Sequence, residues 1–226
     1  MTTLRKSWEL VLDIFFPPIC LNCKKYLEDN EKDNLVCASC LAGIGIYNNL
    51  FYPSPGTTLA AASSYSDPTV RELTHYLKYK GFLKAAKPLG ETLIKYLNRL
   101  NFNPQDFIII PIPLHKSRYR KRGFNQAELL AQVVGNYFNC PIETGVLKRT
   151  KETKPQIELP DYEARSKNLK NGFAINEKYI STIKGKKILL VDDVYTSGAT
   201  MKEATKALRK IGIKEVIGLV VAKADR

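Results

Sequence analysis

Short apolar segments alternate with segments of helical periodicity along most of this 226-residue chain, and this alternation constrains the fold more than any other feature. Residues 107–114, FIIIPIPL, form a continuous apolar run, which is typical of a strand that a parallel sheet buries on both faces. The remaining expected elements are strands at 59–65, 186–191 and 215–223, and helices at 68–80, 85–100, 125–138 and 199–212. Strands that alternate with helices predict an α/β fold with a mostly parallel, helix-covered sheet.

Two stretches depart from this alternation. Residues 48–58, NNLFYPSPGTT, are rich in Asn, Pro and Gly, so we expect a loop and a domain boundary near residue 55. The expected units are residues 1–50, which hold an N-terminal helix and a cysteine-bearing segment, and residues 56–226, which hold the sheet. Residues 141–149 are expected to form a weaker strand, and the polar stretch that follows them lacks apolar anchors.

Four cysteines occur as two pairs with the same internal spacing, Cys20-x2-Cys23 and Cys37-x2-Cys40. Each pair can present two thiolates from one tight turn, and four thiolates complete a structural zinc site with no open position. The segment between the pairs is polar, so the metal would supply its folding free energy. The alternatives are an iron–sulfur cluster, ordinary buried thiols and two disulfides, of which the last are rare in the cytoplasm. The fifth cysteine, Cys140, is expected in the core.

Residues 191–200, VDDVYTSGAT, carry the clearest functional signal of the chain. The apolar strand before them would deliver Asp192 and Asp193 to the carboxyl end of the sheet, where open α/β sheets bind ligands. The turn that follows leads into a helix, and the first N–H groups of a helix bind phosphate. Carboxylates beside a phosphate pocket suit vicinal hydroxyls, so the pattern indicates a sugar phosphate. The alternative is that one of the two carboxylates only caps the helix.

This stretch resembles the 5-phosphoribosyl-1-pyrophosphate (PRPP) motif of type I phosphoribosyltransferases. The resemblance implies a sheet of the type I phosphoribosyltransferase kind, with ribose hydroxyls bound by Asp192 and Asp193 and magnesium carried by the pyrophosphate. It also implies that the turn binds the 5-phosphate of PRPP. The turn residues are Thr196, Ser197, Gly198, Ala199 and Thr200.

Further segments, spread in order over nearly the whole chain, resemble the ComF family of competence proteins. They are the cysteine pairs, YLKYKG at 76–81, PIPLHKSRYRKRGFNQAELLA at 111–131, LKRTKETKPQ at 147–156 and ARSKNLKNGF at 164–173. Many members have two threonines where this chain has TSG, and the hydroxyl is retained. The resemblance implies a part in DNA uptake during natural transformation, or in related handling of single-stranded DNA, with partners among the competence proteins.

A dense basic stretch follows the strand at 107–114, at the same end of the sheet as the acidic pair. Its cations could neutralise pyrophosphate, or follow a nucleic-acid backbone while Tyr119 and Phe124 stack on bases; a solvated surface loop is the alternative. By resemblance, the loop after this strand contacts pyrophosphate, and a mobile loop from Arg149 to Gln156 closes over the substrate. The residues expected to contact pyrophosphate or nucleic acid are Lys116, Arg118, Arg120, Lys121, Arg122 and Arg149.

The charge balance favours an anionic partner, because 35 Lys and Arg against 22 Asp and Glu give a formal net charge of +13. No apolar run approaches the roughly 18 residues that cross a bilayer, and no signal peptide is expected, so the expected location is the cytoplasm. Two function classes stay open. One is a ComF-like protein that binds PRPP, magnesium and single-stranded DNA. The other is an active phosphoribosyltransferase, unrelated to DNA uptake, with an unidentified base or amine as acceptor.

Overall fold

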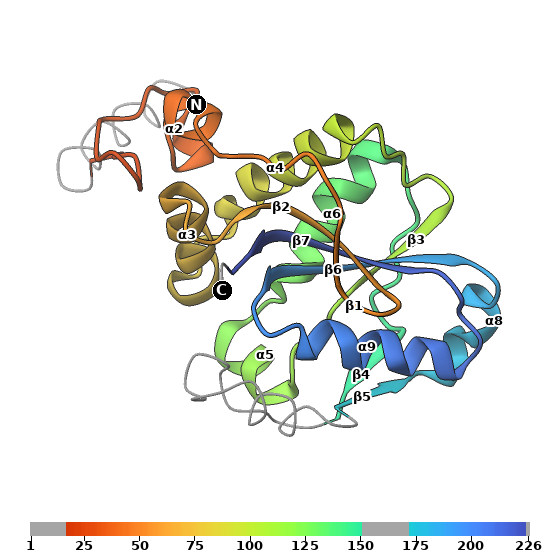
Figure 1. Ribbon diagram of the computed structural model, residues 1–226. Helices are drawn as coiled ribbons and strands as arrows, with labels where there is room; N and C mark the ends of the chain where they lie inside the picture. Colours follow the sequence, from red (N-terminus) through yellow and green to blue (C-terminus); the bar gives the residue numbers. More distant parts are fainter. Residues whose placement is uncertain (1–16, 151–171, 225–226) are drawn as a thin grey trace.

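The computed structural model describes residues 17–150 and 172–224, and it has the predicted α/β fold (Figure 1). The strands of the main sheet, in spatial order, are β1 (Phe51–Ser54), β2 (Thr57–Ser64), β7 (Val216–Lys223), β6 (Lys187–Tyr195) and β3 (Phe107–Pro111). β1 pairs with β2 in antiparallel orientation, and all the other neighbours pair in parallel. The expectation of a mostly parallel sheet is therefore confirmed.

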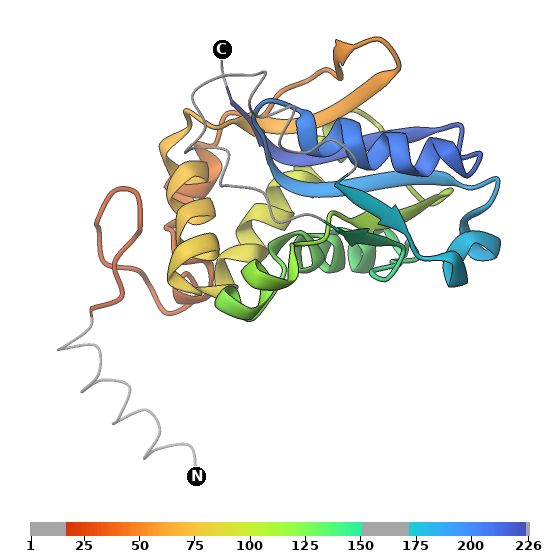
Figure 2. The same cartoon turned by 90° about the horizontal axis from the view of Figure 1, so that it is seen from below.

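Helices cover both faces of this sheet (Figure 2). One face carries α3 (Pro68–His75), α4 (Ala86–Arg99) and α6 (Gln126–Phe138), and the other face carries α9 (Ala199–Lys210). In β6, Leu189 and Val191 belong to the buried cluster on the side of α4 and α6, whereas Ile188 and Leu190 belong to the cluster on the side of α9. A strand that is buried on both faces needs apolar residues at successive positions, which explains its continuous apolar sequence.

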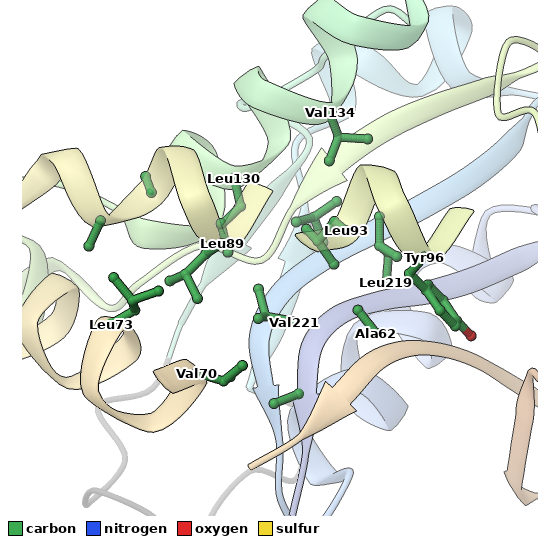
Figure 3. Close-up of a cluster of buried hydrophobic side chains, with 14 of the residues drawn as sticks. Ala62, Val70, Leu73, Leu89, Leu93, Tyr96, Leu130, Val134, Leu219 and Val221 are labelled. Carbon is green, nitrogen blue, oxygen red and sulfur yellow. The ribbon is translucent and has the colours of Figure 1, made fainter. Parts of the chain in front are cut away.

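The larger cluster joins three helices to the central strands (Figure 3). It contains Leu93 of α4, Leu130 of α6 and Leu219 of β7, all of them fully buried. α4 and α6 approach each other closely at Gly90, where an added Cβ would overlap the side chain of Val133. Dense packing of this kind fixes the helices relative to the strand ends that carry the candidate site.

Shorter elements connect the main ones. They are η1 (Lys32–Asn34), α2 (Ala38–Ala42), η2 (Tyr76–Lys80), η3 (Leu83–Ala85), α5 (Lys116–Arg122), β4 (Leu147–Arg149), β5 (Phe173–Ile175), η5 (Glu177–Tyr179) and α8 (Ile180–Ile183). η2 is a π-helical turn that continues α3 and ends at Gly81, in the left-handed region with φ 71°. Among the helices of the described ranges, none has the length and hydrophobicity of a membrane span.

Three local expectations differ from the structure. The stretch 48–58, expected as a loop, contains β1, because Phe51 pairs with Leu59 across a tight turn. Within the stretch 141–149, expected as one weaker strand, the structure has two separate pairings: Ile142 forms an isolated parallel bridge with Ile109 of β3, and β4 pairs with β5 in a separate two-stranded antiparallel sheet. The basic stretch is the helix α5 rather than a loop, and His115 caps it by accepting a hydrogen bond from the Ser117 N–H.

The cysteine segment and α3 share one cluster of buried apolar side chains. Leu21, Leu27 and Val36 of this segment belong to the same cluster as Val70 and Leu73 of α3. The division into units 1–50 and 56–226 stays a proposal about folding units. The expected N-terminal helix and most of the polar stretch after β4, including Gln156, lie outside the described residues.

Candidate functional site

The candidate site lies where the parallel strands end. Asp192 and Asp193, near the carboxyl end of β6, line a cavity together with Tyr65 after β2 and Ile112 after β3. The volume of this cavity is about 160 Å³, and we call it the central cavity. Its other polar lining residues are Lys78, Tyr79, Arg118, Arg122, Gln126, Arg149, Thr196 and Thr200. The fold thus brings the acidic pair, two hydroxyl residues and three arginines to one cavity.

Asp193 is held by an almost fully buried ion pair. Its Oδ2 lies 2.9 Å from Lys78 Nζ, and the two side chains are only 4% and 19% exposed. Its Oδ1 accepts a hydrogen bond of 2.7 Å from the Val194 N–H. Burial opposes the charged ammonium of Lys78, but the negative charges of Asp193 and Asp192 outweigh this effect and raise the pKa of Lys78. Lys78 therefore stays charged at neutral pH and neutralises one of the two carboxylates.

Asp192 has a different electrostatic balance. Its Oδ1 accepts a hydrogen bond of 2.9 Å from the Asp193 N–H. Burial raises the pKa of Asp192 to about 7, the charge of Asp193 adds to this rise, and Lys78 and Arg149 act in the opposite direction. Carboxyl groups with such raised pKa values are concentrated at functional sites. A ligand whose hydroxyl groups donate to this carboxylate would favour its charged form.

The turn after β6 is compact and specific for glycine at one position. Gly198 has a φ of 75°, and the ring of Tyr195 occupies the space that a Cβ of Gly198 would need. Ser197 Oγ accepts a hydrogen bond of 3.4 Å from the Ala199 N–H, where α9 begins. A helix of this length directs its first N–H groups and the positive end of its dipole towards a ligand at the turn.

The turn residues take different positions around the site. Thr196 and Thr200 line the central cavity, and Gly198 joins them around an adjoining hollow of about 10 Å³. Ser197 lines a separate cavity next to Lys223, and Ala199 is buried. Contact through a side chain therefore fits the two threonines, whereas the other three turn residues can offer only backbone groups to a ligand in the central cavity.

The helical spacing of α5 places its basic residues in different surroundings. Arg118 and Arg122, one helical turn apart, both line the central cavity. Lys116 and Arg120, also one turn apart, are exposed and do not line this cavity. Lys121 lines a neighbouring cavity. The five basic residues, which the sequence presents as one cluster, thus point to different surroundings.

Arg149 of β4 and Arg122 of α5, which line the central cavity, are both partly buried. Arg149 lies with its guanidinium carbon 5.5 Å from the centre of the Phe173 ring. Burial lowers the pKa of Arg149 to about 10, and the positive charge of Arg118 adds to this effect. Arg122 donates to Gln126 Oε1, and burial lowers its pKa as well. Both remain charged at neutral pH, so they can bind an anion without first taking up a proton.

Four of the polar residues that line the central cavity were not revealed by the sequence pattern: Tyr65, Lys78, Tyr79 and Gln126. The segment 76–81 was expected as the end of a helix and as part of a family resemblance, without a role at the site. An alternation of basic and aromatic residues at the end of a helix was the available signal, but it does not show which way the side chains face. The π-helical turn η2 places Lys78 and Tyr79 at the cavity, and that turn depends on tertiary packing.

The four paired cysteines lie together at one end of the molecule. Their four Sγ atoms are all within 4.8 Å of one another. Cys23 Sγ and Cys37 Sγ are 3.6 Å apart, near the separation of about 3.8 Å for thiolates that lie about 2.3 Å from a tetrahedral zinc. A hydrogen bond with Ser39 lowers the pKa of Cys37 to about 6, which favours the thiolate that binds metals, whereas burial raises the pKa of Cys40 to about 12. The cluster therefore fits a metal ion with four sulfur ligands.

The cysteine cluster is tied to α3, the helix that leads into η2. Asn22 Nδ2 donates to Thr69 Oγ1 at 2.9 Å and to Cys40 Sγ at 3.5 Å. Asp67 caps α3 by accepting from the Thr69 and Val70 N–H groups. The cluster thus lies at the start of the helix whose other end positions Lys78. Cys140 is buried away from this cluster, as expected for a core cysteine.

Comparison with known proteins agrees with this arrangement. Residues 119–226 match the model of the phosphoribosyl transferase domain family. The chain is 39% identical to competence protein F of Haemophilus influenzae over 108 residues, which are 48% of this chain and 46% of that protein. It is 30% identical to DNA utilization protein YhgH of Salmonella typhi over 167 residues (73% and 71%), and 35% identical to competence protein ComFC of Bacillus subtilis over 150 residues (66% and 57%).

Solved structures with some similarity include the allosteric regulatory enzyme of purine biosynthesis, at 18% identity and a TM-score of 0.40, covering 62% of this chain and 26% of the other. A purine phosphoribosyltransferase from Pyrococcus horikoshii has 20% identity and a TM-score of 0.34, with coverage of 62% and 82%. The sequence relationships are the stronger ones. The similarity to YhgH extends over more than two thirds of both proteins, and the phosphoribosyl transferase domain follows a four-cysteine cluster. The chain therefore belongs to the ComF family of competence proteins.

Proposed function

We propose that this protein binds PRPP and magnesium in the central cavity, and that it serves the uptake or use of single-stranded DNA. The observation that carries the first part is the meeting of Asp192 and Asp193 with the turn at the start of α9, beside Arg118 and Arg122. The second part is supported by relatives whose names refer to competence and to DNA utilization.

The cavity offers carboxylates for the hydroxyl groups of PRPP and offers N–H groups and cations for its phosphates. The ribose hydroxyls donate to Asp192 and Asp193, and the 5-phosphate accepts from the first N–H groups of α9 and from the threonine hydroxyls of the turn. The pyrophosphate lies beside Arg118 and Arg122, because two N–H groups of one guanidinium can bind two phosphate oxygens. Oxygen donors are the ligands that magnesium prefers, and a bound magnesium ion would neutralise the pyrophosphate.

The exposed part of α5 is the proposed surface for single-stranded DNA. Lys116 and Arg120 point away from the central cavity and can contact phosphates of the strand. Tyr119 is exposed and can stack on a base, whereas Phe124 packs against the buried core. The stacking role expected of both aromatic residues therefore falls to Tyr119 alone.

A transferase is the second candidate function, because another cavity adjoins the central one and gives an acceptor access to the ribose. In such a reaction the bond between ribose C1 and pyrophosphate breaks and pyrophosphate leaves with the electron pair. An acceptor nitrogen bonds to C1 and gives up a proton. The carboxylates of the acidic pair would stabilise the positive charge that develops on the ribose ring.

The test is a calorimetric titration of the protein with PRPP, with and without magnesium, followed by an assay for released pyrophosphate. We expect saturable, magnesium-dependent binding. Ribose 5-phosphate and pyrophosphate should each bind more weakly, because each occupies only part of the cavity. No binding of PRPP in either condition would refute the proposed ligand. Binding without pyrophosphate release, with bases, amines and nucleotides offered as acceptors, would favour the binding function over the transferase.

A further inference from the structure

A second, larger cavity adjoins the central one. Its volume is about 430 Å³, and we call it the lateral cavity. It shares Lys78, Tyr79, Arg118 and Arg122 with the central cavity, so the two are neighbours with a common wall. Cavities of roughly 300–1,000 Å³ are typical of small-molecule sites. The lateral cavity is therefore large enough for a ligand of its own.

The lining of the lateral cavity is strongly cationic. Besides the shared Lys78, Arg118 and Arg122, it contains Lys80 and Lys121, and no carboxylate is among its described lining residues. The carboxylates of the site face the central cavity, where Lys78 already pairs with Asp193. A cavity with walls of one sign of charge attracts a ligand of the opposite sign. The expected ligand therefore carries anionic oxygens.

Tyr79 gives the lateral cavity a flat aromatic wall. Its side chain is 58% exposed, and the guanidinium carbon of Arg122 lies 5.9 Å from its ring centre. The ring of His75 lies next to the ring of Tyr79: the ring centres are 5.3 Å apart, and the ring planes are inclined at 43°. Aromatic rings and arginine planes stack on nucleobases with little sequence preference. A ligand with a planar ring and anionic oxygens would fit both properties of the cavity.

The cations of the lateral cavity exceed what PRPP would use. Arg118 and Arg122 line both cavities and are placed for pyrophosphate, whereas Lys80 and Lys121 line the lateral cavity and not the central one. The side chain of Lys80 comes from η2, and that of Lys121 comes from α5. Both residues are exposed, so ligands from solution can reach them.

We propose that the lateral cavity binds a nucleotide, with its phosphate near Lys80 and Lys121 and its base along Tyr79. A free mononucleotide and a nucleotide of a single strand present the same phosphate and base, so either source fits. In a transferase, this second ligand would be the acceptor, and the acceptor would be a nucleotide rather than a free base or a simple amine. The inference rests on the proposed function only for the identity of the ligand in the central cavity.

The experiment measures binding of thymidine 5′-monophosphate and of thymidine by calorimetry, each with and without saturating PRPP and magnesium. The test variant is Lys80→Ala with Lys121→Ala. The control variant is Lys95→Ala with Lys214→Ala, which removes the same charge from exposed positions outside both cavities. We expect the monophosphate to bind at least tenfold more tightly than thymidine in the wild type and the control, because hydrogen bonds to charged groups are the strong ones. The test variant should lose this preference and keep its affinity for PRPP.

Three results would overturn the inference: equal affinities for thymidine and its monophosphate, competition between the monophosphate and PRPP, or an unchanged preference in the test variant. Competition would mean that the lateral cavity belongs to the PRPP site. If the wild type bound the nucleotide but did not bind PRPP, the proposed function would be refuted and this inference would stand. An oligothymidylate with and without a 5′-phosphate identifies the source: sensitivity to the end phosphate indicates a terminal nucleotide, and insensitivity indicates one within the strand.

Discussion

Single side chains balance the charge at the centre of the candidate site. Lys78 Nζ lies 2.9 Å from Asp193 Oδ2, and the positive charges of Lys78 and Arg149 also lower the pKa of Asp192 against the effect of burial. Removing one member of a buried ion pair leaves the other charge uncompensated. Lys78 is therefore expected to support both the stability of this region and the charge state in which it meets a ligand.

Replacing Lys78 with methionine should lower the free energy of unfolding by about 3 kcal/mol at neutral pH, the lower end of the range for broken buried pairs. The loss should shrink at pH 5, where the unpaired carboxyl groups can take up protons. Urea denaturation at the two pH values measures this effect, with Lys95→Met as a control at an exposed position. Equal stability of the two variants at pH 7 would show that the ion pair contributes nothing.

The raised pKa of Asp192 predicts a pH dependence of binding and stability. Because burial lifts this pKa from 3.8 to about 7, the folded protein resists ionisation. The stability that this protonated group contributes is present below about pH 4 and is lost as the pH rises to about 7. PRPP binding, which needs the carboxylate, should instead strengthen by about tenfold between pH 6 and pH 8.

Calorimetry at pH 6, 7 and 8 measures this trend. The phosphate groups of PRPP also titrate near pH 6, so the comparison needs the Asp192→Asn variant, which keeps the ligand contribution and lacks the carboxyl one. A pH dependence that is the same in wild type and variant would rule out Asp192 as its source.

The acidic pair and the two threonines of the turn could be predicted at the central cavity because their placement is local. Asp192, Asp193, Thr196 and Thr200 follow one another at a strand end, so the order of the chain alone brings them to one edge of the sheet. Lys78 could not be assigned in this way, because its partner lies on a strand that is distant in sequence and the contact depends on the packing of α3 against the sheet.

At the level of elements, the helix α5 directs its basic side chains to two different places, the cavities and the solvent, whereas its sequence presents them as one cluster. A loop would let all five basic side chains reach the same ligand. In the helix, Arg118 and Arg122 face the cavities, while Lys116 and Arg120 face solvent. The separation between PRPP and DNA contacts proposed above follows from helical spacing, and the sequence did not reveal it because a charged heptamer after a strand has no apolar periodicity.

The helix therefore allows two paired variants with opposite effects. Lys116→Ala with Arg120→Ala should flatten the dependence of log K on log salt for an oligonucleotide by about 1.4, at roughly 0.7 per lost phosphate contact, and leave PRPP affinity unchanged. Arg118→Ala with Arg122→Ala should weaken PRPP binding at least tenfold and change the slope little. Fluorescence titrations of a labelled oligonucleotide at several salt concentrations measure the slopes. The reverse pattern would show that the arginines hold DNA, and unchanged slopes in both variants would move the DNA site elsewhere.

On the scale of the whole molecule, the alternation of apolar strands and helices was sufficient to predict the sheet and its parallel pairing. It did not predict β1, which lies in a stretch whose Asn, Pro and Gly content resembles a loop, or the separate sheet of β4 and β5. Edge strands and small accessory sheets depend on one or two pairings rather than on a buried apolar run. The sequence also did not show that the cysteine segment would share its apolar cluster with α3, because this packing depends on a few contacts between segments that have no common sequence pattern.

The shared cluster makes the proposed zinc site a determinant of overall stability. We expect about one zinc per chain, and a marked loss of stability when a chelator removes it, because Leu21 and Val36 are then no longer held against α3. Elemental analysis and thermal unfolding with and without chelator measure both effects. The Cys140→Ser variant is the control for zinc content, since Cys140 is not one of the four clustered cysteines. Less than half an equivalent of zinc under reducing conditions, without iron or sulfide, would contradict the assignment.

The central claim is that Asp192 and Asp193 bind the ribose of PRPP in the central cavity. Its most direct test is a titration of PRPP and magnesium into the wild type, into the Asp192→Asn, Asp193→Asn double variant, and into Asp106→Asn, which changes an exposed aspartate before β3 at the opposite end of the sheet. Each hydrogen bond to a charged group is worth about 1.5–3 kcal/mol, so the double variant should bind at least tenfold more weakly, while Asp106→Asn should match the wild type. Equal affinities in all three proteins would contradict the placement of the ribose at the acidic pair.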